Sequence, residues 1–159
     1  MKNPTTVKRT SERELVVTRT FDGPARIVFE AWTKPDLFKR WWGPKSMGIS
    51  LVACEMDVRA GGTYRLKFSQ GLEFFGKYIE VTPHSRLVWT NDEGGEAGPV
   101  TTLTLEEKDG KTLLVMHELY PSKEALDAAG TGAADATVET FAQLDELLLA
   151  LGANLGVLT

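Results

Sequence analysis

His117 is the side chain in this sequence that is best suited to acid–base or ligand-orienting chemistry. It lies in the run KTLLVMHE and shares the parity of Leu113 and Val115. If that face of the strand looks inward, burial and a nearby carboxylate tune an imidazole for such chemistry. The alternative is a core histidine that bonds to a neighbouring side chain or to the backbone. Glu118 follows directly but points to the opposite face, so it is not automatically the partner of His117.

Acidic residues in the central region would suit general acid–base catalysis if two of them met: Glu55, Asp57, Glu73 and Glu80. Spacing alone brings no two of them together, and antiparallel sheets carry many solvated carboxylates on their outer faces. Nucleophilic catalysis has no support, since no serine sits in a G-x-S-x-G elbow and Cys54 has no basic neighbour in its own strand. The lack of a catalytic motif favours a protein that is not an enzyme.

Metal ligands and phosphate loops are also missing from the sequence. His84 and His117 lie far apart, and Cys54 is the only cysteine, so no metal, no other cofactor and no disulfide are expected. Arg59 and Gly61-Gly62 fit a turn in which glycine supplies a positive φ and the arginine pins the hairpin to a carboxylate. No helix follows these glycines, which excludes a phosphate loop.

The composition fits one soluble domain. The chain has 159 residues, of which 42% are hydrophobic, and this is enough for a core. The formal net charge is −4 and no basic stripe is present, so nucleic acid is not an expected partner. No run approaches the roughly 18 apolar residues of a membrane span, and the polar N-terminus lacks a signal peptide. We therefore expect a cytoplasmic protein without a membrane partner.

The N-terminal part of the chain alternates between a tail, a strand and short helices. Residues 1–12 are expected to form a flexible tail, and a strand follows from Glu14 to the turn at Asp22-Gly23-Pro24. Apolar residues at helical spacing then predict a short helix, with its stripe formed by Ala25, Val28, Phe29 and Trp32. Pro35 ends this helix and starts a second one, which carries Leu37, Phe38, Trp41 and Trp42 as far as Gly43-Pro44.

From residue 49 the pattern predicts six strands in one antiparallel meander. The clearest is TYRLKFS, in which Tyr64, Leu66 and Phe68 oppose Arg65 and Lys67. After Pro121 the chain is helical again. Ser122 caps a short helix that the sequence GTG interrupts, and residues 133–151 form a long amphipathic helix that Gly152 ends. A C-terminal tail is expected over residues 153–159.

This order predicts an α+β fold of the helix-grip type, as a single domain over residues 13–152. A curved antiparallel sheet wraps around the long C-terminal helix, and two short helices follow the first strand. Such a sheet cannot close tightly on a helix along its whole length, so we expect a cavity between them.

The adjacent residues Trp41 and Trp42 cannot both face the same way on a helix, because neighbouring side chains point about 100° apart. We expect one of them to fill the core beneath the short helices and the other to line the rim of the cavity. Packing alone and a lid over a ligand remain alternatives for this pair.

Several segments of the sequence resemble those of a known family: FDGPARIVFEAWTKPDLFKRWWGPK, CEMDVRAGG, GKYIEVTPHSRLVWT and MHELYPS. They are similar to the small bacterial proteins related to the C-terminal domain of the activator of the Hsp90 ATPase, in the START/Bet v 1-like superfamily. The resemblance runs from about residue 14 to 151. It implies a helix-grip fold with an internal cavity, and little about any reaction, since a fold does not supply chemistry.

The chain departs from this family at the start of the long helix. Members usually have a Gly-Trp pair there, where this chain has Ala136-Thr137. A Trp-sized volume is therefore missing from a helix face that should look into the cavity. Gly76, on the face that bears Tyr78, is expected to add room at mid-sheet.

The main functional hypothesis is a protein that binds a small, largely apolar molecule between the sheet and the long helix. The expected lining residues are Trp42, Tyr64, Phe68, Tyr78, Trp89, His117, Thr137 and Phe141. The alternatives are an Hsp90-type chaperone-associated interaction domain and a cyclase- or hydratase-like enzyme. Hsp90 is not an expected partner, because the sequence holds only the cavity-bearing domain. A homodimer is compatible with the exposed edges of such a sheet.

Overall fold

The computed structural model of the protein describes residues 5–42, 46, 48, 51–69, 71, 73–92 and 98–158, with side chains in the last helix described over 123–127 and 137–151. The elements, in chain order, are β1 (Thr6–Arg9), β2 (Glu14–Phe21), α1 (Ala25–Thr33), α2 (Pro35–Phe38), β3 (Leu51–Met56), β4 (Thr63–Phe68), β5 (Glu73–Thr82), β6 (Arg86–Thr90), β7 (Val100–Lys108), β8 (Lys111–Leu119) and α3 (Lys123–Leu158).

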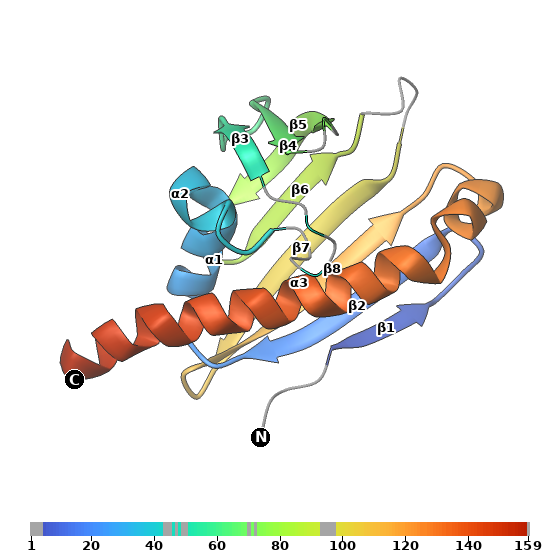
Figure 1. Cartoon of the computed structure of the whole chain (residues 1–159). Coiled ribbons are helices and arrows are strands. Elements are labelled where there is room, and N and C mark those ends of the chain that lie inside the picture. The colour runs from blue at the N-terminus through green and yellow to red at the C-terminus, as the bar shows by residue number, and fades with distance from the viewer. Residues whose placement is uncertain are drawn as a thin grey trace.

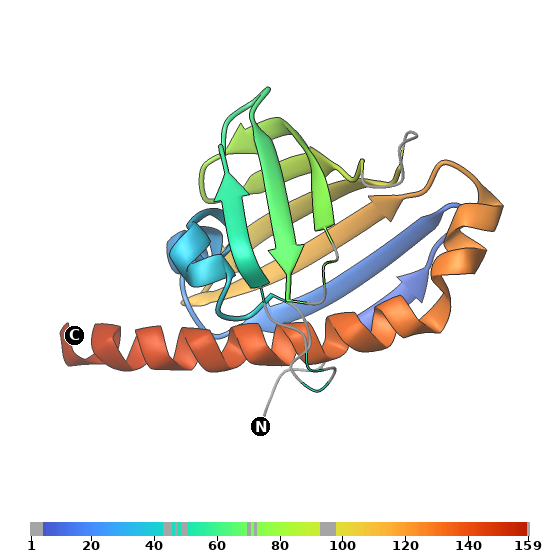
Figure 2. The same cartoon turned by 45° about the horizontal axis from the view of Figure 1, so that its top comes forward.

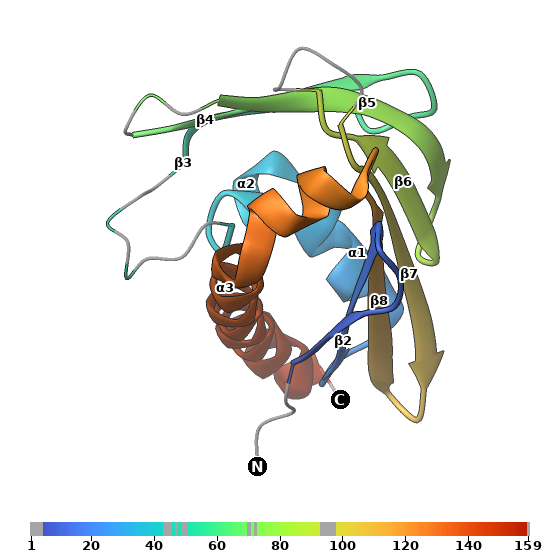
Figure 3. The same cartoon turned by 90° about the vertical axis from the view of Figure 1, so that its right-hand side faces the viewer.

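The strands form one antiparallel sheet in the order β1-β2-β8-β7-β6-β5-β4-β3 (Figure 1). The sheet curves, and α1, α2 and α3 all lie on its concave side (Figure 3). The helix-grip fold and the six-strand meander are thereby confirmed. The concave, inner face is the apolar one: in β4, Tyr64, Leu66 and Phe68 are buried, while Arg65 and Lys67 are exposed.

The first two helices form where the apolar spacing and the prolines predict them. Pro24 stands at the N-cap of α1, and Pro35 occupies the first turn of α2, where a missing N–H costs no hydrogen bond. However, α2 ends at Phe38. Trp41 and Trp42 therefore lie in the turn after the helix, their amides both bonded to the Phe38 carbonyl. The expected stop at Gly43-Pro44 lies outside the described residues.

A flexible tail was expected over residues 1–12, but Thr6–Arg9 form strand β1. It pairs antiparallel with β2 and forms one edge of the sheet. Only Val7 of this strand is partly buried against the core, so the sequence TVKR carries too weak an apolar signal to predict a strand. Backbone hydrogen bonds to β2, which do not depend on side chains, hold it in place.

Helix α3 is longer and more continuous than predicted. Ser122 caps it as expected, since its hydroxyl accepts a hydrogen bond from the Ala125 amide at 3.1 Å. The helix then continues through Gly130-Thr131-Gly132 and past Gly152 to Leu158. The predicted interruption is therefore wrong, and residues 153–158 belong to the helix rather than to a tail. Glycine weakens a helix by only about 1 kcal/mol and ends it only where it turns left-handed. Figures 1 and 2 show the first turns of α3 at an angle to the rest.

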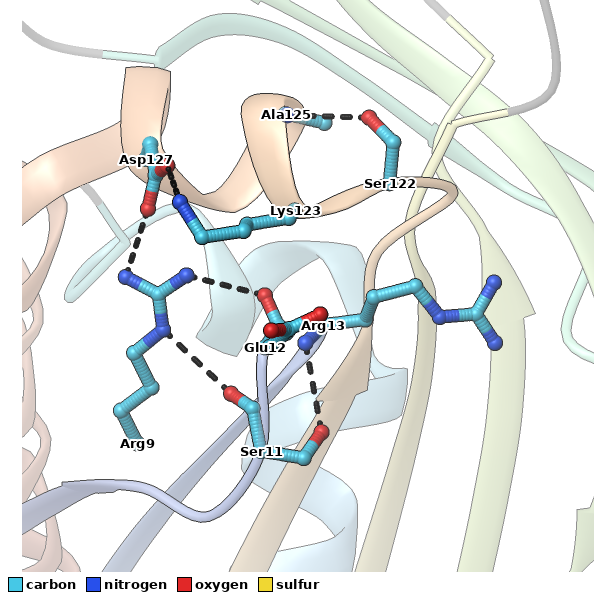
Figure 4. Close-up of polar contacts among 8 residues, drawn as sticks. All are labelled: Arg9, Ser11, Glu12, Arg13, Ser122, Lys123, Ala125 and Asp127. Carbon is cyan, nitrogen blue, oxygen red and sulfur yellow. Dashed lines mark hydrogen bonds and ion pairs between the residues drawn. The ribbon is translucent and has the colours of Figure 1, made fainter.

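The turn between β1 and β2 is tied to the start of α3 (Figure 4). The Arg9 guanidinium pairs with Asp127 at 2.7 Å and donates to the carbonyl oxygens of Ser11 and Glu12. Asp127 also pairs with Lys123, one turn earlier in the helix. These groups are well exposed, so each pair adds at most about 1 kcal/mol. Their role is to position the first turn of α3 against the end of the sheet.

Candidate functional site

A row of side chains crosses the inner face of the sheet close to the point where β8 leads into α3. Direct cross-strand partners make up this inner row: Tyr78, Trp89, Thr101, Glu118 and Leu15. Partners directly opposite one another in antiparallel strands point to the same face of a sheet. A carboxylate therefore stands on the inner face, between a threonine and a leucine.

The inner row is less covered than the row next to it. The next row of cross-strand partners lies two residues further along each strand. It consists of buried side chains: Leu87, Leu103, Met116 and Val17. In the inner row itself, Tyr78 and Thr101 are buried, but Trp89, Glu118 and Leu15 are only half-buried. The helices thus close over the middle of the sheet and leave its inner face partly accessible at this end.

Hydrogen bonds hold the Glu118 carboxyl group in a polar network. The Thr101 hydroxyl donates to Glu118 Oε2 at 3.4 Å and accepts from the Asn91 amide nitrogen at 3.1 Å. The Tyr64 hydroxyl donates to the Thr90 carbonyl at 2.7 Å and lies 3.3 Å from Asn91 Oδ1. The network therefore extends from β4 to β8 across the inner face.

Burial changes the acid–base properties of this end of the sheet. It raises the pKa of Glu118, and hydrogen bonds from Thr101 and Tyr120 oppose the shift. Burial and the nearby Glu118 carboxylate raise the pKa of Tyr120 to about 12. Glu118 can accept a hydrogen bond as a carboxylate or donate one as an acid, and both forms suit contact with a polar group of a ligand.

Glu118→Gln should stabilise the fold more at neutral pH than in acid. Because the pKa of Glu118 is raised on folding, the unfolded chain loses this proton first as pH rises. The wild type therefore loses stability between the unfolded and the folded pKa, and the variant does not. Urea unfolding at about pH 3 and pH 7 measures the difference. Glu106→Gln, at an exposed position of β7, is the control. A Glu118→Gln effect that is the same at both pH values would contradict this expectation.

The residues predicted to line a cavity fall into three groups. Tyr64, Phe68, Tyr78 and Phe141 are buried side chains of the inner face or of α3. Trp42, Trp89 and Thr137 are half-buried. His117 lies on the outer face. Ligand contact by the first two groups stays a prediction.

The side chain of His117 was expected to point inward, but it points to the outer face of the sheet. Leu114 and Met116 take the inner positions of β8, so His117 points outward with Leu113, whose side chain is exposed. Its Nε2 lies 2.7 Å from Glu14 Oε2 on the neighbouring strand. This hydrogen bond holds the pKa of Glu14 below its usual value. His117 is therefore part of a surface pair, and Glu118 is the inward acidic residue of this strand, which also carries the buried Thr112.

Gly76 was expected to leave open space at mid-sheet, but the structure shows none there. A Cβ atom placed there would lie 2.0 Å from the Thr90 carbonyl oxygen and 2.9 Å from Cε2 of Tyr64. The neighbouring backbone and the tyrosine ring occupy the space that a missing side chain suggests. Glycine at this position permits a close approach of the two strands.

Gly76→Ala should therefore destabilise the protein. The clash involves backbone on the adjacent strand, which cannot move as a side-chain end can, and we expect a loss of about 1–3 kcal/mol in the free energy of unfolding. Chemical denaturation measures it. Gly23→Ala is the matched control, since nothing lies within 4 Å of a Cβ at Gly23. Equal stabilities of the two variants would refute the close approach.

Three of the acidic residues considered for catalysis are paired with arginines rather than with one another. Asp57 is paired with Arg59, Glu73 with Arg65 and Glu80 with Arg86, all at partly exposed positions. The Arg59 guanidinium bonds both Asp57 oxygens and Gly61 has φ +86°, which confirms the predicted turn. Burial raises the pKa of Cys54 to about 11, so its thiol stays protonated at neutral pH and is a poor nucleophile.

An open pocket of about 580 Å³ lies on the β3-β4-β5 part of the sheet, and its lining includes Tyr64, which contacts Tyr78 of the inner row. It is lined mainly by exposed polar side chains such as Glu55, Asp57, Arg65 and Lys77. Within the described residues, no three His, Cys, Asp or Glu side chains are grouped to hold a metal ion.

Trp41 and Trp42 differ in burial, as their adjacency predicts. Trp41 is fully buried, and its Nε1 donates to the Ala31 carbonyl at 3.0 Å. Trp42 is half-buried and stacks on Phe38, with ring centroids 4.9 Å apart. Trp41 is thus the core residue of the pair, and Trp42 presents part of its ring to the surface.

Comparisons with known proteins agree with this architecture. A family model described as "Activator of Hsp90 ATPase homolog 1-like protein" matches residues 22–149. Among curated proteins, none matches the chain. A solved structure from Rhodobacter sphaeroides is 26% identical with a TM-score of 0.82, and the match covers 92% of this chain and 99% of that one.

Two further solved structures show the same fold. A protein from Nitrosomonas europaea is 24% identical with a TM-score of 0.79, over 91% of this chain and 99% of that one. A protein from Mycobacterium smegmatis is 25% identical with a TM-score of 0.76, over 93% and 99%. None of the described helices combines the length and apolar character that a membrane span needs.

Proposed function

Because this chain belongs to the family of activator of Hsp90 ATPase homolog 1-like proteins, we propose that it binds a small, largely apolar molecule between the curved sheet and α3. The observation that carries this proposal is the partial exposure of the inner row, where Trp89, Glu118 and Leu15 are half-buried on a face that is otherwise covered. Large apolar side chains left partly open on a concave face are typical of a ligand site.

Further support comes from Trp89 of the inner row and the aromatic residues next to it. Trp89 packs on the buried Trp32 at 5.7 Å between ring centroids, and Trp32 contacts Trp42 at the same distance. Trp89 and Trp42 are both half-buried. Aromatic faces that are fixed by neighbours and open on one side offer a flat ligand apolar contact without a large cost in side-chain entropy.

Trp32 also holds an indole N–H that has no hydrogen-bond partner among the described residues, although the side chain is buried. A buried donor without an acceptor costs about 1–3 kcal/mol. A polar atom on an otherwise apolar ligand would relieve this cost, which agrees with a ligand that is largely but not wholly apolar.

Thr137→Trp tests the proposal. Thr137 is half-buried and lies one turn before the fully buried Phe141 on α3. If space is open beside it, the new indole should fill it, leave the melting temperature unchanged or raised, and compete with an apolar probe. Fluorescence titration with phenylnaphthylamine, a neutral apolar dye, measures the binding.

Val138→Trp is the matched control, because Val138 is the next residue in the helix and is exposed. It should leave dye binding unchanged. If Thr137→Trp instead costs about 1–3 kcal/mol by overpacking, and the wild-type protein binds no dye, the proposed function is wrong.

A further inference from the structure

Glu118 is the ionisable carboxyl group in a row whose other side chains are apolar or uncharged. Its neighbours in the inner row are Thr101 and Leu15, and Trp89 and Tyr78 follow on the far side of Thr101. His117, the nearest histidine in sequence, faces the opposite side of the sheet and pairs with Glu14. No positively charged side chain of the inner row offsets Glu118.

The cations in β2 and just before it already have partners. Arg13, which is exposed, donates to the Pro121 carbonyl at 3.4 Å. Arg19 lies on the inner face of β2, two positions beyond Val17, and is buried. Its guanidinium pairs with Asp145 on α3 and donates to Thr5. An anionic ligand at the inner row would therefore find neither of these arginines free to pair with it, and would be repelled by Glu118 in its carboxylate form.

The carboxyl group keeps hydrogen-bonding capacity for a ligand. Two carboxylate oxygens offer about four acceptor sites, and the hydroxyls of Thr101 and Tyr120 use two of them. The contact from Thr101, which itself accepts from Asn91, fixes the orientation of the group. Because Glu118 is only half-buried, the remaining sites are within reach of a molecule that rests on the inner row.

We propose that Glu118 makes the site selective for apolar molecules that carry a hydrogen-bond donor, such as a hydroxyl or an amine, and against apolar anions. This inference rests on the proposed function and names the class of its ligand. A donor-bearing ligand would place its apolar body against Leu15, Trp89 and the aromatic residues beyond, and its hydroxyl or amine on the free Glu118 lone pairs. A carboxylate ligand would be repelled at the same point.

Four naphthalene probes of one shape test the selectivity: naphthalene itself, naphthol, naphthylmethylamine and naphthoate. Dissociation constants come from quenching of tryptophan fluorescence at about pH 7, with ligand-detected NMR as a second measurement. We expect naphthol and naphthylmethylamine to bind about ten- to a hundredfold more tightly than naphthoate. Glu118→Gln should abolish this preference, so that naphthol, naphthylmethylamine and naphthoate bind with similar affinity. Glu106→Gln, an exposed carboxylate on β7, should keep the wild-type order.

The outcomes separate the two proposals. If no probe binds, naphthalene included, the proposed function is wrong and the selectivity with it. If naphthalene binds but the wild-type protein holds naphthoate as tightly as naphthol, the selectivity is wrong and the proposed function stands. The same holds if Glu118→Gln, shown by its thermal unfolding to be folded, keeps the wild-type preference. Should that variant not fold, the wild-type order of affinities alone decides.

Discussion

Replacing Trp41 with alanine should lower the free energy of unfolding by about 3–5 kcal/mol, among the largest effects available in this chain. The side chain is fully buried. Its ring centroid lies 4.8 Å from that of Trp32, 5.3 Å from that of Phe38 and 6.5 Å from that of Phe141. Alanine would remove the indole that joins the two short helices to α3 and would leave a cavity among them.

The indole N–H of Trp41 has a second role. The Ala31 carbonyl lies in the last turn of α1, where the amide of residue 35 would normally bond it, but residue 35 is proline and has no N–H. Trp41 Nε1 donates to this carbonyl in its place. Trp41→Phe keeps most of the ring contacts and removes this hydrogen bond. Its free energy of unfolding should therefore lie between those of the wild type and of Trp41→Ala.

Trp42→Ala is the matched control, since Trp42 is adjacent in sequence but half-buried. Its cost should be clearly smaller, because less apolar area returns to water. Denaturant unfolding of the three variants at one pH measures the series. Equal losses for Trp41→Ala and Trp42→Ala would show that the two indoles contribute alike, which contradicts the burial described above.

The strands and helices of this fold are largely predictable from the sequence, because alternation and helical spacing are strong in it. TYRLKFS keeps its apolar residues on one face, and the prolines mark the starts of α1 and α2. Strand β1 escapes prediction because an edge strand is held by backbone bonds, and its sequence TVKR has no alternation strong enough to reveal it.

The candidate site is less predictable, and β8 shows the reason. Both faces of KTLLVMHEL carry apolar residues, with Leu113 and Val115 on one face and Leu114 and Met116 on the other. Alternation along the strand therefore places His117 on the same face as Leu113, but it does not show which of the two faces points inward. Only the pairing of β8 with β2 and β7, and the helices that cover one side, place Glu118 inward and His117 outward.

Gly76 shows a second limit. A glycine in a strand removes side-chain volume, and the sequence alone suggests space at that point. In the structure, the approach of the neighbouring strand uses this space, so the glycine marks a close backbone contact rather than part of a cavity. The distance between strands depends on the curvature of the whole sheet, which no local pattern encodes.

Replacing Asp145 with alanine should cost about 3–5 kcal/mol, because it leaves a buried guanidinium without its counter-ion. Asp145 on α3 lies 3.2 Å from Arg19 Nη2 on the inner face of β2, and both side chains are at most 10% exposed. Arg19 Nη1 keeps its bond to Thr5 at 2.7 Å, but Nε already has no partner among the described residues. Thermal and urea unfolding measure the loss.

Glu146→Ala is the matched control for the removal of a carboxylate from α3. Glu146 is the next residue and is exposed, so its replacement should change stability by no more than about 0.5 kcal/mol. If Asp145→Ala costs as little as Glu146→Ala, the Arg19–Asp145 pair does not hold α3 on the sheet.

The double variant Arg19→Met/Asp145→Leu separates the cost of a lost partner from the value of the pair itself. Desolvation of two buried charges offsets most of their attraction, and apolar residues of similar size often replace such a pair with no loss or with a gain of about 1–4 kcal/mol. We therefore expect the double variant to be at least as stable as the wild type, although Asp145→Ala alone is strongly destabilised. The methionine at position 19 would still lie between Val17 and Phe21 on the inner face of β2. A double variant as unstable as Asp145→Ala would instead mean that the ion pair contributes net stability between β2 and α3.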